Sequence, residues 1–217
     1  MLKKQVDVRR LAVLAMLCGL AYLSVLVLSP IKIQFLSFEI KDAILAIGGF
    51  LYGPVAGLLS VILVAFLELV TISKTGLIGL LMNVLSSAFF LCPAALVYKK
   101  DRSLKGAVIG LSLGIVLSTA AMLLWNWLIT PLYMGVPRSQ VVNMLIPLFL
   151  PFNSLKGGVN AVLTVLLYKS VVTALRKARL FPQSTGEASV GKAKILLPTL
   201  LILITLVLIV LAWSGII

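Results

Sequence analysis

Long apolar runs constrain this sequence more than any other feature. The chain has 217 residues, of which 61% are hydrophobic and 12% charged, and its mean hydropathy is +1.18. A soluble domain of this composition would expose one continuous apolar surface, so we expect an all-α membrane protein. A bilayer core needs about 20 residues per helix, so the second of the expected helices is too short to cross alone. The helices are expected at 11–29, 43–52, 54–70, 76–98, 106–130, 144–171 and 195–213.

Basic residues flank these runs. Fourteen of the 19 Lys and Arg fall into three groups: Lys3, Lys4, Arg9 and Arg10; Lys99, Lys100, Arg102 and Lys105; Lys169, Arg176, Lys177, Arg179, Lys192 and Lys194. The positive-inside rule places all three on the cytoplasmic side if the N-terminus is cytoplasmic. Of the other five, Lys32, Lys41, Lys74 and Arg138 are then outside, and Lys156 is within the membrane. The net charge of +13 does not indicate a nucleic-acid partner, because no aromatic residues are interleaved with these groups.

The residue inventory argues against an enzyme. The chain has no His, and its two cysteines, Cys18 and Cys92, lie in separate apolar runs, where small packing residues are common. No metal-ligand cluster and no G-x-x-x-x-G-K-[ST] phosphate-binding run is present. Nor does the chain have the doubled architecture of a self-sufficient secondary transporter. We therefore expect a binding subunit without a cofactor or metal, which depends on an external energy source.

Polar residues interrupt three of the apolar runs at similar depth near the outer surface. In "LPFNSLKGGVN" (150–160), Asn153, Lys156 and Asn160 lie on one helical face. Asn83 and Asn126 are expected at a similar depth on two other helices. A charge inside a bilayer usually faces a cavity, a partner or a ligand, and the nearest acids are near span ends, so we expect Lys156 to face a ligand. The asparagines have alternatives: interhelical hydrogen bonds, or for Asn126 anchoring at the interface beside two tryptophans.

Five segments resemble the substrate-binding S components of energy-coupling-factor (ECF) vitamin importers, most closely the riboflavin-specific type. They are "FEIKDAI", "GGFLYGPVAGLLS", "TGLIGLLMN", "NWLITPLYMGVP" and "LPFNSLKGGVN", within a resemblance that spans about residues 8–178. The glycine-proline segment is shared across S components, whereas "PFNSLKG" and "NWLITPLY" point to riboflavin. The resemblance implies a six-helix bundle in a bacterial cytoplasmic membrane. It also implies partners: a scaffold membrane subunit and two ATP-binding subunits.

The resemblance also implies roles for individual residues. Asn126, Asn153 and Lys156 would hydrogen-bond the polar edge of the flavin ring, and Asn83 is a further substrate-binding residue. Glu39 and Lys41, in the expected outer loop, would meet the ribityl hydroxyls or close the pocket. On the first helix, Ala15 and Gly19 form a small-xxx-small step that would dock on the scaffold subunit, unless it packs inside the chain.

The predicted organisation is a six-helix substrate-binding domain at 1–178, a basic and polar cytoplasmic linker at 179–194, and an additional transmembrane helix at 195–217. The predicted function is capture of riboflavin, with FMN as a second candidate ligand, and its delivery inward with an ATP-hydrolysing module. Two alternatives stay open: an S component for thiamin, biotin or folate, and a membrane scaffold protein that is not a transporter.

Overall fold

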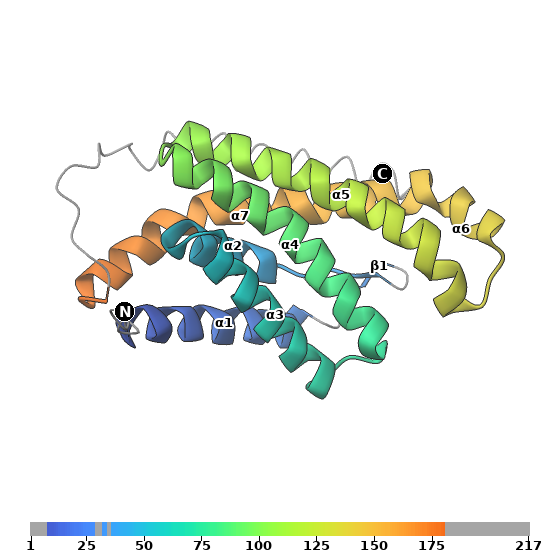
Figure 1. The fold of residues 1–217 in the computed structure, drawn as a ribbon, viewed down its shortest axis with the longest axis horizontal. Helices are drawn as coiled ribbons and strands as arrows, with labels where there is room; N and C mark the ends of the chain where they lie inside the picture. Colours follow the sequence, from blue (N-terminus) through green and yellow to red (C-terminus); the bar gives the residue numbers. More distant parts are fainter. Residues whose placement is uncertain (1–7, 29–31, 34–35, 181–217) are drawn as a thin grey trace, which may run out of the picture.

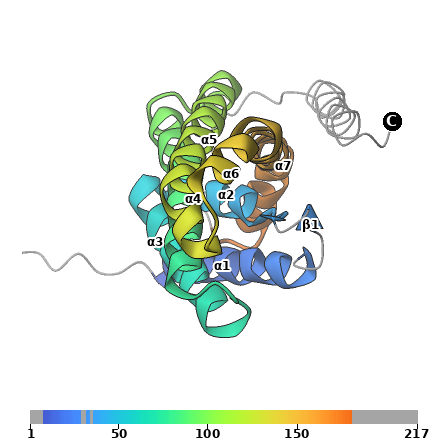
Figure 2. The same ribbon diagram turned by 90° about the vertical axis from the view of Figure 1, so that its right-hand side faces the viewer.

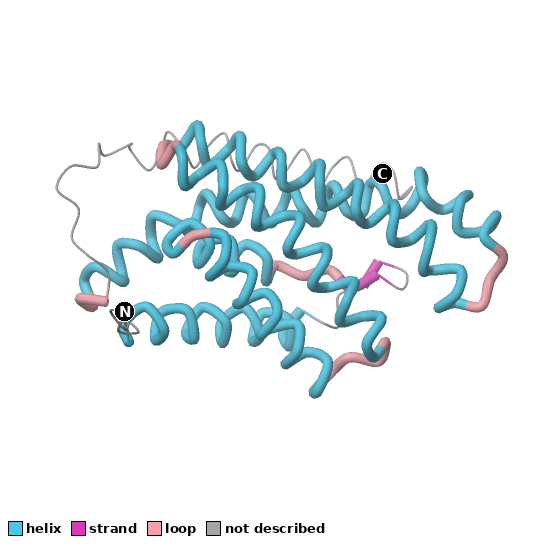
Figure 3. Tube along the Cα trace, viewed as in Figure 1, coloured by secondary structure: helices cyan, strands magenta, loops and turns pink. Residues whose placement is uncertain are grey.

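The computed structural model describes residues 8–28, 32–33 and 36–180. The linker beyond residue 180 and the last predicted helix, at 195–213, lie outside the described residues. The described part is a helical bundle with one short hairpin, as Figures 1 and 3 show. The predicted all-helical class is confirmed. The helices are α1 (Val8–Leu28), α2 (Lys41–Tyr52), α3 (Pro54–Thr71), α4 (Gly76–Lys100), α5 (Leu104–Met134), α6 (Arg138–Met144), the π-helical turn η1 (Leu145–Phe149) and α7 (Leu150–Lys177).

Five of the described helical stretches are long and apolar enough to cross a membrane: α1, α3, α4, α5 and the continuous stretch from α6 to α7. Large apolar side chains such as Leu23, Phe66 and Leu132 are exposed on their outer faces, which suits contact with lipid. The predicted six-helix count remains open, because α2 has 12 residues and is not among these five. We therefore describe the fold as five spanning helices around one short helix.

Helix α2 lies at the centre of the bundle. Nine of its 12 residues are buried, and it packs against α1, α3, α4 and α7, as the end-on view in Figure 2 illustrates. The turn into α3 depends on Gly53, whose φ of 93° is unfavourable for other residues. Pro54 then occupies the first turn of α3, where a missing N–H costs nothing. The short helix is thus the core that the spanning helices enclose.

Basic residues gather at one end of the bundle. Figure 1 places the start of α1, the α4–α5 connection and the end of α7 on the same side. These segments carry Arg9 and Arg10, Lys99 and Lys100, and Arg176 and Lys177. Their common position agrees with one cytoplasmic face, although which face is cytoplasmic remains a prediction of the positive-inside rule.

Two segments differ from the sequence expectations. The run 144–171 is interrupted by η1, because Pro151 has no N–H for the Pro147 carbonyl and its ring would clash with that carbonyl in an α-helix. The chain widens to π-helical bonding there before α7 continues. The expected outer loop contains a hairpin of β1 (Lys32–Ile33) and β2 (Leu36–Ser37), with Ile33 paired to Leu36.

Close packing of α4 and α5 depends on glycines that face backbone. A Cβ at Gly110 would lie 2.8 Å from the Ala94 carbonyl oxygen, and one at Gly114 would overlap the Phe90 carbonyl oxygen. By contrast, nothing lies within 4 Å of a Cβ built at Gly19. Small residues of this kind let membrane helices approach closely.

We predict that Gly114→Ala forces α4 and α5 apart and lowers the free energy of unfolding by about 1–3 kcal/mol. Gly19→Ala is the matched control and should leave stability unchanged or slightly raised, because Ala is the better helix former. The measurement is the apparent Tm of each variant in detergent. Equal Tm values for the two variants would contradict the close approach of α4 and α5.

Candidate functional site

Five charged side chains form one cluster inside the apolar bundle. Glu39, Lys41, Asp42 and Glu68 are each at most 7% exposed, and the side chain of Lys156 is 12% exposed. The Lys41 ammonium lies 2.6 and 2.7 Å from the two carboxylate oxygens of Glu68 and 3.0 Å from Glu39 Oε2. Glu39 Oε2 also accepts from Lys156 Nζ at 3.1 Å. One carboxylate of the segment before α2 therefore joins lysines from α2 and α7.

Glu39 is the carboxylate that both lysines contact, and they determine its pKa. Burial raises the pKa of the Glu39 carboxyl, but the ammonium groups of Lys156 and Lys41 outweigh this and lower its pKa to about 2. Because the folded-state pKa is depressed, these ion pairs stabilise the fold above the ordinary pKa of Glu and lose their contribution as pH falls towards 2. Glu39 is thus ionised at any physiological pH.

Helix α7 also holds the start of α2 through Asn160. The Asn160 Oδ1 accepts from the Ala43 N–H at 2.8 Å, and its Nδ2 donates to the Glu39 carbonyl at 2.9 Å. The N-cap residue of α2 is Ile40, whose side chain offers no hydrogen bond. Asn160 therefore supplies from another helix the cap that the local sequence lacks.

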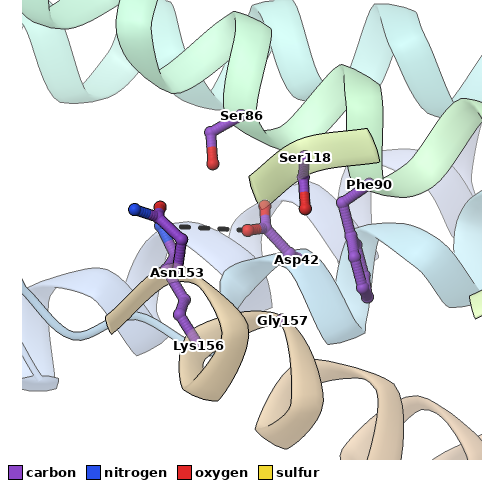
Figure 4. Close-up of a pocket in the computed structure, with 7 residues that line it drawn as sticks. All are labelled: Asp42, Ser86, Phe90, Ser118, Asn153, Lys156 and Gly157. Atoms are coloured by element: carbon purple, nitrogen blue, oxygen red, sulfur yellow. Dashed lines mark ion pairs between the residues drawn. The ribbon is translucent and has the colours of Figure 1, made fainter. Parts of the chain in front are cut away.

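A small cavity lies beside the charged cluster, between α2, α4, α5 and α7. Figure 4 shows Asp42, Asn153 and Lys156 directed towards it, with Ser86 and Ser118 across from them. The Lys156 ammonium lies 3.9 Å from Asp42 Oδ2. Asn153 uses one Nδ2 proton to donate to the Phe149 carbonyl at 2.7 Å, which leaves a second amide proton and an oxygen. The remaining lining residues are Phe90 and Gly157.

A second small cavity lies between the start of α4 and the end of α5. Its lining is mainly apolar and aromatic: Thr75, Ile78, Gly79, Met82, Trp125, Ile129, Thr130 and Tyr133. Asn126 lies next to it on α5, where its Oδ1 accepts from the Thr130 hydroxyl at 2.8 Å and its Nδ2 donates to the Met122 carbonyl at 2.7 Å.

The structure brings some of the predicted site residues together and separates others. Asn153 and Lys156 line the first cavity side by side. Asn83 lies apart from it, where its Nδ2 donates to Glu68 Oε2 at 2.7 Å, and Asn126 is hydrogen-bonded to Thr130, which lines the second cavity. Ala15 and Gly19 are exposed on the outer face of α1.

One sequence expectation about charge is wrong. Lys41 is not in an outer loop: it is the first residue of α2, 2% exposed, and paired with Glu68. Lys156 has two acidic neighbours: Glu39 from the segment before α2 and Asp42 from the first turn of α2. One signal of these contacts is present in the sequence, since three acids lie in or beside apolar runs that contain two lysines. Sequence reasoning also missed the contributions of Asp42, Ser86 and Ser118 to the cavity.

Comparison with known proteins matches residues 9–168 to the family model described as "ECF transporter, substrate-specific component". The chain is 29% identical over 177 residues to the riboflavin transporter RibU of Staphylococcus aureus (strain TCH60), covering 78% of this chain and 93% of that protein. It is 28% identical over 172 residues to the riboflavin transporter FmnP of Bacillus subtilis (strain 168), covering 74% and 90%. A solved structure described as "Structure and mechanism of the S component of a bacterial ECF transporter" aligns with a TM-score of 0.65 at 27% identity, covering 77% of this chain and 97% of that chain.

We predict that Lys41→Met destabilises the fold by about 3–5 kcal/mol, because it leaves the Glu68 carboxylate buried without its ammonium partner. The double variant Lys41→Met/Glu68→Leu should recover part of this loss, since it removes both charges and keeps apolar volume. Thermal unfolding in detergent measures the effect. A double variant as unstable as the sum of the two single variants would contradict a direct pair.

Proposed function

The chain belongs to the family of ECF transporter substrate-specific components, and we propose that it captures riboflavin outside a bacterial membrane and delivers it inward. The observation that carries the proposal is the cavity shared by Asn153 and Lys156, in a chain whose relatives are named riboflavin transporters. The homologues are transporters rather than enzymes, which agrees with a binding role. The chain is a multi-pass protein of the bacterial membrane.

The chemistry of the ligand supports the proposed site. The flavin ring carries two carbonyl acceptors and an imide N–H on one edge, and apolar methyl groups on the opposite edge. The ammonium of Lys156 and the free amide proton of Asn153 match carbonyl acceptors, and the Phe90 ring offers an apolar surface to the rest of the flavin. Asn126, at the edge of the second cavity, remains a proposed ring contact.

The size of the cavities bears on how the ligand is admitted. Neither has room for a drug-sized ligand, whose sites typically have volumes of about 300–1,000 Å³. A tricyclic ring with a ribityl chain therefore requires neighbouring elements to move apart. The Glu39–Lys156 pair joins the segment before α2 to α7 and is a natural point of such movement, whereas Lys41 and Asn83 are engaged with Glu68.

We propose that transport depends on partner subunits. The sequence has no phosphate-binding run of the P-loop type, so ATP hydrolysis would come from two ATP-binding subunits, joined through a scaffold membrane subunit. The exposed face of α1 that includes Ala15 and Gly19 is the proposed docking surface. The two small side chains, four residues apart, allow another helix to pack closely against α1.

We predict that Lys156→Met lowers riboflavin affinity by roughly 5- to 150-fold, because it buries a ligand acceptor without a donor. Glu39 keeps Lys41 as a partner, so the variant should still fold. Lys74→Met, an exposed lysine between α3 and α4, is the matched control and should bind as the wild type does. Titration by quenching of flavin fluorescence measures both, and equal affinities in a folded Lys156→Met would remove this lysine from the site.

We predict that Gly19→Leu weakens association with the scaffold and ATP-binding subunits while riboflavin affinity stays at the wild-type value, because the cavities lie on other helices. Ala120→Leu, at an exposed position on α5, is the control for added bulk on a lipid-facing helix. Co-purification with the partner subunits and a flavin titration are measured in parallel. An intact complex with impaired flavin binding would show that this face of α1 is not the docking surface.

A further inference from the structure

Asp42 is the acid in the cluster that lacks a close cation. Glu68 and Glu39 each lie within 3.1 Å of a lysine ammonium, whereas the ammonium nearest to Asp42 is that of Lys156, at 3.9 Å from Oδ2. Its Oδ1 accepts a hydrogen bond from the Ser87 hydroxyl. Among the described residues, Oδ2 accepts no hydrogen bond, although Asp42 is only 4% exposed. Because Asp42 lines the first cavity, a donor group of a ligand placed there can reach its carboxylate.

The free oxygen belongs to the wall of the first cavity. Asp42 lines it together with Asn153 and Lys156, and Figure 4 shows the carboxylate directed to the same space as these two side chains. Asp42 lies in the first turn of α2. The cavity therefore presents two donors, from Lys156 and Asn153, and one anionic acceptor.

This set of groups is complementary to an imide. The polar edge of a flavin has one N–H between two carbonyls, that is, one donor flanked by two acceptors. We propose that Asp42 accepts the hydrogen bond of this imide N–H and is a specificity-determining residue for the ligand, an assignment that rests on the proposed riboflavin-binding function. The Asn153 oxygen competes for the same proton, but a carboxylate makes the stronger charge-assisted hydrogen bond.

The proposal predicts discrimination between two ligands that differ only at this nitrogen. A site built to bind an N–H rejects an analogue that lacks it, because its buried acceptor is left unpaired. N3-methylriboflavin has a methyl group in place of the imide proton and keeps both carbonyls. Wild-type protein should therefore prefer riboflavin over N3-methylriboflavin by at least about 100-fold.

The test is a titration of both flavins against the wild type, Asp42→Ala and Asn153→Leu. Asp42→Ala removes the acceptor and makes room for the methyl group, so the preference should fall to within roughly threefold of unity. Asn153→Leu should weaken both ligands and keep the preference, because it leaves the acceptor in place. A ratio between two ligands on one variant is insensitive to a loss of folded protein.

Two outcomes would overturn the assignment. If the wild type binds the two flavins equally, no residue of the site accepts a hydrogen bond from the imide N–H. This measurement uses the wild type alone, so it does not depend on whether a variant folds. If Asp42→Ala keeps the wild-type preference, the acceptor is another group and Asp42 serves to position Lys156 and Ser87. Wild-type protein that binds neither flavin would instead refute the proposed function and this assignment with it.

Discussion

The burial of five charged side chains in an apolar bundle is the constraint on which the rest of the structure depends. None of Glu39, Lys41, Asp42 and Glu68 is more than 7% exposed, so each ion needs its partner within the protein. An uncompensated charge there costs several kcal/mol, and the elements that carry these residues are obliged to meet. The segment before α2 must turn inward, and α3 and α7 must flank α2. Asn160 then caps α2 from α7, which fixes the short helix at the centre of the bundle.

The same interactions connect the fold to the proposed activity. Lys156 pairs with Glu39 on one side and lines the cavity on the other. A ligand acceptor that draws the ammonium into the cavity weakens its bond to Glu39, so ligand binding and the position of the segment before α2 are physically linked. A ligand shifts such an equilibrium by its difference in affinity for the two arrangements. For a subunit that must take up a vitamin and later release it to the other side, this linkage gives partner subunits a way to alter affinity by moving one segment.

The sequence predicts the membrane class, most helix positions and the common end of the basic residues, because these follow from hydropathy and charge along the chain. It also predicts that Asn153 and Lys156 share a face, since i, i+3 spacing fixes this locally. The pairing of Lys41 with Glu68 and of Lys156 with Glu39 could not be predicted, because the first pair is 27 positions apart in the sequence and the second 117. The partner of Asn83 could not be predicted either. Its amide donates to Glu68 because α3 and α4 pack together, and this contact is not local in the sequence. The π-helical turn before α7 was readable in principle from Pro147 and Pro151, whose spacing excludes a regular α-helix.

In the proposed function, the bundle holds riboflavin at the cavity of Asn153 and Lys156. The most direct measurement is the visible absorbance spectrum of the full chain, purified in detergent from cells that contain riboflavin. Bound flavin gives a yellow protein, and the account predicts a stoichiometry of one flavin per chain after gel filtration. A colourless protein that stays colourless after incubation with excess riboflavin and desalting, while its thermal stability responds to another vitamin, would contradict the account.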